Sequence, residues 1–133
     1  MATPSDRRYT DQHEWALVQG DDGGATVVRV GITDHAQDAL GDIVYVQLPE
    51  VGEEVTPGTA IGEVESTKSV SDVYSPVAGV VAAVNPALAD APETVNADPY
   101  GGGWLVEIAV EGEGDPTADL LDAAAYSALV DAS

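Results

Sequence analysis

Residues 62–76 decide how this chain folds, and they read GEVESTKSVSDVYSP. Two strand-like halves meet there at small polar residues on either side of Lys68. Such an arrangement is typical of a tight turn that joins two antiparallel strands. We therefore predict a β-hairpin whose tip holds the amine of Lys68 out in water.

Lys68 is the only lysine of the chain, and the other basic residues are three arginines. A lysine amine in water is almost fully protonated near neutral pH and attacks an acyl group only after losing a proton. A Schiff-base lysine would need a desolvated pocket, and a hairpin tip beside Glu65 offers neither burial nor a cationic neighbour. An exposed amine suits enzymatic acylation instead. The alternative is a merely solvated lysine, which its singularity and its place between two strands disfavour.

Short stretches with apolar residues at every second position recur along the chain, separated by glycine and proline. They cover residues 14–18, 25–32, 43–48, 60–65, 70–74, 77–84 and 104–110. Period-2 alternation is typical of half-buried strands, and on it we place Val44, Val46 and Leu48 together on one buried face. Many short strands with Gly and Pro turns predict a mainly β fold, a flattened barrel or sandwich with short helices.

Helices are expected at three places. Thr33 can cap a short helix over residues 34–40, which Gly41 ends, and Asn85 can cap another that begins at Pro86. Apolar residues at helical spacing predict a C-terminal helix over residues 116–131, packed on the barrel. Its stripe consists of Leu120, Leu121, Ala124, Ala128 and Leu129. Residues 1–8 are expected to be loose.

The length of 133 residues suits one globular domain, and we predict that residues 1–133 form one. No run approaches the ~18 uninterrupted apolar residues of a membrane span, and the N-terminus shows no apolar signal region before its first charges. On this basis we expect a cytoplasmic protein without a membrane partner. We also expect a monomer.

The chain has 24 acidic residues against 4 basic ones and a net charge of −20, with no cysteine. Such a surface repels a phosphate backbone, which disfavours nucleic acid and anionic membranes as partners. The charge also fits solubility or adaptation to high salt. Without cysteine, disulfides, thiolate metal sites and cysteine nucleophiles are excluded, and any redox chemistry must arrive on an added group.

No motif of an enzyme or a metal site stands out. His13 and His35 are separated by a predicted strand and lack the spacing of metal ligands, so we expect surface or capping histidines and no metal. Gly101-Gly102-Gly103 precedes a strand instead of a helix, and no serine sits in a G-x-S-x-G turn. The sequence therefore predicts a non-catalytic protein.

The hairpin and several further blocks resemble the H proteins of the glycine cleavage system. The hairpin blocks are Glu65-Ser66-Thr67-Lys68 and Ser71-Asp72-Val73-Tyr74-Ser75-Pro76-Val77-Ala78-Gly79. The others, in the same order as in the family, are Tyr9-Thr10, His13-Glu14-Trp15, Gly31-Ile32-Thr33-Asp34-His35-Ala36-Gln37, Leu40-Gly41-Asp42, Asn96, Asp98-Pro99-Tyr100 and Gly103-Trp104. The likeness spans roughly residues 9 to 126.

Two sister families resemble the same hairpin less well. Lipoyl domains of 2-oxo acid dehydrogenase complexes typically have Asp before the modified lysine, where this chain has Thr67. Biotinyl carrier domains usually flank their lysine with methionines, and here the neighbours are Thr67 and Ser69. The N-terminal and C-terminal blocks also have no counterpart in either family.

The resemblance implies a fold of the lipoyl/biotinyl hybrid type and a lipoate attached covalently to Lys68 by a lipoylating enzyme. It implies a carrier that takes an aminomethyl group from the P protein, a glycine decarboxylase, to the T protein, an aminomethyltransferase. The L protein, dihydrolipoyl dehydrogenase, then receives the electrons. It also implies that the loaded arm docks against the carrier near Glu14 and Asp72. The alternative is an H-like lipoylated module for lipoate relay or redox-linked signalling.

Overall fold

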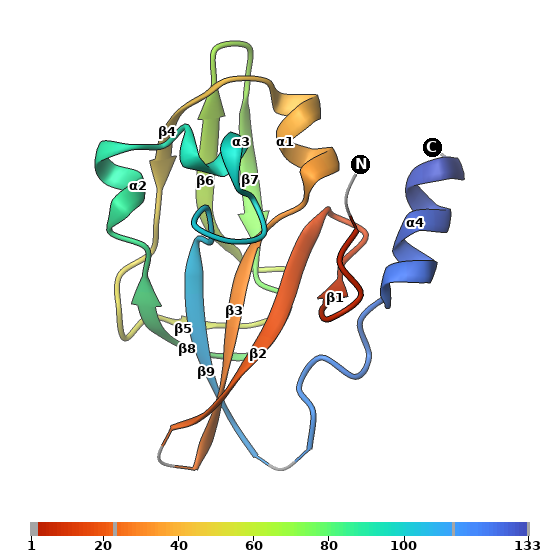
Figure 1. Ribbon diagram of the computed structural model, residues 1–133. Helices are drawn as coiled ribbons and strands as arrows, with labels where there is room; N and C mark the ends of the chain where they lie inside the picture. The colour runs from red at the N-terminus through yellow and green to blue at the C-terminus, as the bar shows by residue number, and fades with distance from the viewer. Residues whose placement is uncertain (1–2, 23, 113, 133) are drawn as a thin grey trace.

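Two antiparallel sheets form the molecule, and the computed structural model describes residues 3–22, 24–112 and 114–132. The larger sheet has the order β1 (Arg8–Tyr9), β2 (Glu14–Asp22), β3 (Ala25–Ile32), β9 (Val106–Glu111), β8 (Gly79–Val84) and β5 (Glu54–Val55). The smaller sheet has the order β4 (Ile43–Gln47), β6 (Ala60–Ser66) and β7 (Val70–Tyr74). The predicted mainly β fold is confirmed as a sandwich whose sheets do not close into a barrel (Figure 1).

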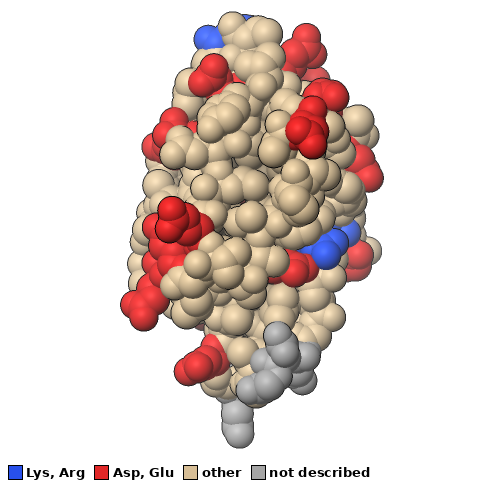
Figure 2. Space-filling view, turned by 90° about the vertical axis from the view of Figure 1, so that its left-hand side faces the viewer, with Lys and Arg blue, Asp and Glu red and all other residues tan. Residues whose placement is uncertain are grey.

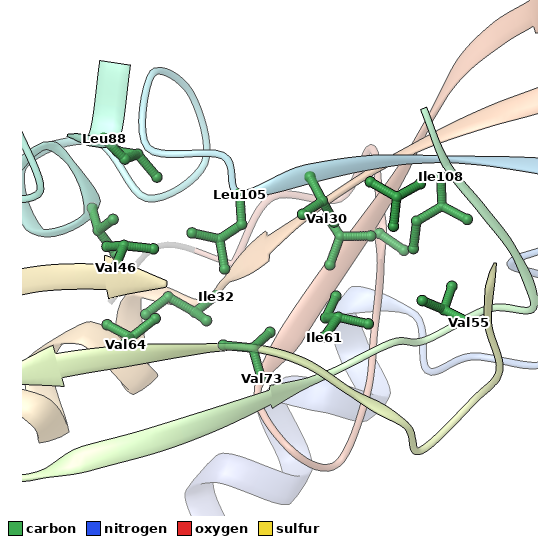
Figure 3. Close-up of a cluster of buried hydrophobic side chains, with 14 of the residues drawn as sticks. Val30, Ile32, Val46, Val55, Ile61, Val64, Val73, Leu88, Leu105 and Ile108 are labelled. Carbon is green, nitrogen blue, oxygen red and sulfur yellow. The ribbon is translucent and has the colours of Figure 1, made fainter. Parts of the chain in front are cut away.

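The core lies between the two sheets. Val28 and Val30 of β3 are 0% exposed, and from the smaller sheet Val64 and Val73 are 0% and 3% exposed. Figure 3 shows side chains of both sheets pointing toward one another across this layer. Burial of branched aliphatic side chains removes apolar surface from water and holds the sheets face to face. Ile32 is the third buried member of this face of β3, at 5% exposed, which agrees with the alternation predicted for residues 25–32.

The prediction that Val44 shares a buried face with Val46 is wrong. A β-bulge interrupts the pairing of β4 with β6 between Ile43 and Tyr45. Ile43 and Val46 are buried at 3% and 8%, whereas Val44 and Tyr45 are 48% and 57% exposed. A bulge inserts one extra residue, so strict alternation fails on either side of it.

Helix α1 (Asp34–Leu40) lies where the sequence predicts it. The Thr33 hydroxyl oxygen accepts a hydrogen bond from the nitrogen of Ala36 at 3.2 Å, and Gly41 ends the helix at a φ of 86°. Two one-turn helices follow later, α2 (Ala87–Asp90) and α3 (Thr94–Ala97). None of the helices in the described part of the chain is long and apolar enough to cross a membrane.

The C-terminal helix α4 (Ala123–Ala132) begins seven residues later than predicted. Leu121 instead makes a two-way backbone pair with Tyr9, with N···O distances of 2.8 and 2.9 Å, and so stays extended. The predicted stripe is also displaced, because Ala124 and Ala128 are exposed. Tyr126, 2% exposed, is the buried residue of the helix, and its ring stacks on that of Tyr9 at 4.7 Å.

The N-terminal segment also differs from the predicted loose residues 1–8. Arg8 begins β1, and the Arg7 guanidinium lies 4.7 Å from the centre of the Trp15 ring while donating to the carbonyl of Tyr100 at 3.0 Å. Residues 1 and 2 of this segment lie outside the described part of the chain.

Candidate functional site

Lys68 lies at the free end of the β6–β7 hairpin, which projects beyond the rest of the sandwich (Figure 1). The tip is organised around Ser66, which is only 6% exposed. Its hydroxyl oxygen accepts hydrogen bonds from the nitrogens of Lys68 and Ser69, both at 3.1 Å, and its own nitrogen donates to the Ser69 carbonyl at 2.8 Å. Hydrogen bonds within the four residues 66–69 therefore fix the backbone around the lysine.

A second contact holds the tip against the loop between α1 and β4. The nitrogen of Thr67 donates to the carbonyl of Asp42 at 3.1 Å. Asn96 of α3 braces this loop from the other side: its amide oxygen accepts from the nitrogen of Ile43 at 2.8 Å, and its amide nitrogen donates to the carbonyl of Gly41 at 2.8 Å. The hairpin tip thus rests on a loop that is itself tied to the body of the protein.

The side chain of Lys68 is exposed, and its stem passes over Gly41. A Cβ at Gly41 would lie 2.9 Å from Cε of Lys68, so the absence of a side chain there leaves room for the stem. Among the described residues the amine makes no ion pair and no hydrogen bond. The predicted exposed lysine at a hairpin tip therefore matches the structure.

Glu14 lies far from the tip and is 2% exposed. One carboxylate oxygen accepts from the Thr10 hydroxyl at 2.7 Å, and the other accepts from the nitrogen of Tyr74 at 3.1 Å. Burial raises the pKa of Glu14 to about 7, although these two hydrogen bonds act in the opposite direction. Glu14 lines a groove of about 660 Å³ together with Pro57 and Leu121.

Asp72 lies on the outward face of β7, opposite Glu63 of β6, and is exposed. It lines a different groove, of about 810 Å³, formed with Gln47, Pro49 and Glu63. The two grooves share no residue, so the structure does not bring Glu14 and Asp72 together. Asp72 is four residues from Lys68, which is about 13 Å along a strand at a rise of ~3.3 Å per residue.

A polar cluster that the sequence pattern did not predict lies under α4. The hydroxyl of Tyr126 lies 2.7 Å from Nδ1 of His13 and 2.8 Å from the hydroxyl of Thr33. The ring centres of His13 and His35 are 4.7 Å apart, and burial together with the nearby His35 lowers the pKa of His13. Within the described residues, no group of three or more His, Cys, Asp and Glu side chains could hold a metal ion.

A signal for Tyr126 was present in the sequence. The carboxylate of Asp122 accepts from the nitrogen of Ala125 at 2.8 Å, as an N-cap does. Counted from that cap, Ala123, Tyr126 and Val130 recur at i, i+3 and i+7, and they form the face of α4 that packs on Tyr9.

Comparison with known proteins assigns this arrangement to a family. The model of the glycine cleavage H-protein family matches residues 7–133, which include Glu14, Lys68 and Asp72. The chain belongs to the glycine cleavage H-protein family. The match covers the hairpin and also the segments toward both ends of the chain, which agrees with the resemblance seen in the sequence blocks.

Individual members of the family are similar over nearly the whole chain. The glycine cleavage system H protein of Beutenbergia cavernae is 58% identical over 131 residues, covering 97% of both chains. That of Mycolicibacterium smegmatis is 57% identical over 129 residues, covering 96% of this chain and 95% of the relative. The crystal structure of an H protein from Mycobacterium marinum matches with a TM-score of 0.83 at 47% identity, covering 96% of this chain and 98% of that one.

Proposed function

We propose that this chain carries a lipoyl group in amide linkage to Nζ of Lys68 and serves as the carrier of the glycine cleavage system. The observation that carries the proposal is the exposed amine of the only lysine, at a tip whose backbone Ser66 and Asp42 hold in place. Membership of the H-protein family supports the same assignment.

The residues around Lys68 fit such a group. Among the described residues the amine makes no ion pair or hydrogen bond that acylation would break. The glycine beneath its stem also leaves space for the side chain to turn outward. A Schiff-base function would need a buried amine, which this exposed side chain is not. The geometry favours a lysine that is acylated over one that acts as a nucleophile in a reaction cycle.

When bound, a lipoyl group supplies a disulfide that can accept an aminomethyl group and electrons, chemistry that a chain without cysteine lacks. The chain's own part is to hold and present. We propose that the tip presents the lipoyl arm to the active sites of the P, T and L proteins in turn, after a lipoylating enzyme has attached the group to Lys68. A stiff projecting tip suits this role because it presents Lys68 beyond the rest of the sandwich.

We also propose that the chain works as one carrier domain, because a continuous buried core joins residues of both sheets with Leu88 and Val95 of the short helices. For the loaded arm, we propose docking in the groove of Asp72. This carboxylate is exposed on the hairpin itself, whereas both oxygens of Glu14 already accept hydrogen bonds from the chain. A charge-assisted bond to a protonated amine would favour the Asp72 site.

The attachment is tested on the chain expressed with a lipoylating enzyme. Trypsin cuts the unmodified chain after Lys68, whereas acylation blocks that cut and leaves one peptide from Val30 to the C-terminus, heavier by the lipoyl mass. The Lys68→Arg variant, which cannot be lipoylated, serves as control and keeps the cut. An intact, unshifted mass of the wild-type chain under these conditions would contradict the attachment.

The carrier role is tested separately by glycine-dependent exchange of carbon dioxide in the presence of P protein. The acylated wild-type chain is expected to support exchange, and Lys68→Arg is expected to give none. An acylated chain that supports no exchange would favour the relay or signalling alternative.

A further inference from the structure

A row of exposed side chains crosses the outward face of the smaller sheet directly beside the tip. Tyr45 of β4 pairs in register with Glu65 of β6, and Glu65 pairs with Val70 of β7. Residues directly opposite one another across strands share a face of the sheet. Tyr45 is 57% and Val70 54% exposed, so two apolar side chains flank the acidic side chain of Glu65. Glu65 lies three residues before Lys68, and Val70 lies two residues after it. We call these three residues the tip row.

Exposed apolar surface is concentrated here. Six large apolar residues of the described chain are exposed, and three of them, Val44, Tyr45 and Val70, lie in or next to the tip row. Val44 is exposed because of the bulge that also turns Tyr45 outward. Scattered single exposures are ordinary, whereas a cluster beside a functional group is typical of a contact surface.

The surroundings of the tip row are acidic. The next row of the sheet brings together Gln47, Glu63 and Asp72. Of these, the carboxylates of Glu63 and Asp72 form no ion pair within the described residues, and neither does Glu65. Figure 2 shows acidic side chains spread over the side of the molecule that lies on the left in Figure 1, with few basic atoms among them, some at the end where the hairpin projects. A surface that fits the tip row would therefore present an apolar patch bordered by lysine or arginine.

The reach of each enzyme decides which partner must contact this surface. An enzyme that acts on a group at the far end of a flexible arm can do so without approaching the sheet. The enzyme that forms the bond to Nζ cannot, because its reacting atoms must come within bonding distance of a side chain that starts at the tip. Only the acylating step requires a partner surface at the positions of Tyr45 and Val70.

We propose that the tip row, Tyr45, Glu65 and Val70, is a docking surface for the enzyme that acylates Lys68, through an apolar patch edged with basic side chains. The proposal rests on the function proposed above and adds how the acylating enzyme recognises the folded chain. In the step concerned, Nζ loses a proton and attacks the carbonyl carbon of an activated acyl donor, an acyl adenylate or a thioester. A C–N bond forms, the C–O or C–S bond to the leaving group breaks, and adenylate or thiol departs.

The experiment compares two double variants of the full chain. Tyr45→Thr with Val70→Thr removes the apolar part of the tip row and keeps residues that favour strands. Val18→Thr with Val80→Thr is the matched control, since these valines are also exposed, at 42% and 39%, but lie in the other sheet. Acylation by a lipoylating enzyme with its acyl donor is followed by intact mass at varied concentrations of the chain.

We expect the tip-row variant to raise KM about tenfold with little change in kcat, since loss of a few central contacts weakens docking without altering the reacting amine. The control variant is expected to stay within about twofold of wild type. Raising the salt concentration should also raise the wild-type KM, because basic groups on the enzyme would face this acidic surface. Acetylation by a small activated ester should proceed at the same rate in all three chains, since it needs no docking.

An unchanged KM in the tip-row variant would overturn the docking proposal while leaving the lipoyl attachment intact. A slower reaction with the small ester as well would overturn it too, because the tip itself would then be altered. If acylation is unchanged but pre-acylated variant chains need a higher concentration for carbon dioxide exchange, the surface serves the decarboxylase instead. If the wild-type chain is not acylated at all, the proposed function fails together with this inference.

Discussion

The carboxylate of Glu14, at the start of β2 in the larger sheet, accepts a hydrogen bond from the nitrogen of Tyr74, at the end of β7 in the smaller sheet, at 3.1 Å. This contact joins the base of the lysine hairpin to the opposite sheet. Because a buried carboxylate is costly unless it has partners, the bond fixes where the hairpin leaves the sandwich. Glu14 therefore supports the hairpin from below, while Asp42 supports its tip.

The buried position of Glu14 predicts a pH-dependent contribution to stability. Burial raises its pKa from 4.5 to about 7, so the folded chain holds this proton more tightly than the unfolded chain does. The free energy of unfolding therefore falls as pH rises from about 4.5 to about 7, where Glu14 ionises in the folded state. Glu14→Gln removes the titration, and the stability of wild type relative to the variant should drop by about 3 kcal/mol across this window.

Urea denaturation of both chains at a series of pH values measures this difference, with Glu54→Gln as an exposed control. A difference between wild type and Glu14→Gln that stays constant with pH would show that Glu14 does not titrate in this range.

The hydrogen bonds that Asn96 makes to the loop before β4 predict that it stabilises the hairpin tip. Asn96→Ala leaves the nitrogen of Ile43 and the carbonyl of Gly41 without their partner and should lower the free energy of unfolding by about 1–3 kcal/mol. The loop that accepts the Thr67 hydrogen bond then loosens, so the Thr67 amide should exchange its hydrogen faster.

Hydrogen exchange read by NMR tests this, with the amide of Gly58, which donates to Ser75 at the other end of the hairpin, as internal reference. Equal acceleration of both amides would indicate a global loss of stability and not a local role of Asn96.

The two hydrogen bonds of the Tyr126 hydroxyl predict how much this group contributes to the packing of α4 on the rest of the chain. Tyr126→Phe keeps the ring that stacks on Tyr9 but removes the group that bridges Thr33 and His13. A loss of about 1–3 kcal/mol in the free energy of unfolding is expected, because buried polar groups lose their partner. Thermal or urea unfolding measures it, and Tyr45→Phe, which removes an exposed hydroxyl, should have little effect.

Close packing predicts that alanine will destabilise the chain at one glycine and not at another. Gly31 lies opposite Trp15, and a Cβ there would come within 2.6 Å of the fully buried indole ring. Gly31→Ala should therefore destabilise the chain by about 1–3 kcal/mol or more. Gly102→Ala is the matched control, because its nearest neighbour would be the Thr94 methyl at 3.5 Å, an ordinary contact. Similar unfolding midpoints for the two variants would contradict this account.

Local pattern was sufficient for the hairpin and for the buried face of β3. Residues 62–76 carry their own turn signal and alternation, and Val28, Val30 and Ile32 follow strict period 2, so neither needs information from distant residues. The cap of α1 is equally local, since Thr33 and Gly41 act within a few residues of the helix they bound.

Long-range contacts decided the rest. Leu121 pairs with the backbone of Tyr9, 112 residues away, and α4 therefore begins after it. A bulge in the pairing of β4 with β6 turns Tyr45 outward. One of the two hydrogen-bond partners of Glu14 is likewise a backbone nitrogen of the other sheet. Which side chain is buried or paired in such places depends on what packs against it, and a single strand or helix does not encode that. The sequence alone determined that one lysine would stand at a hairpin tip; the packing of the two sheets determined what holds that tip still.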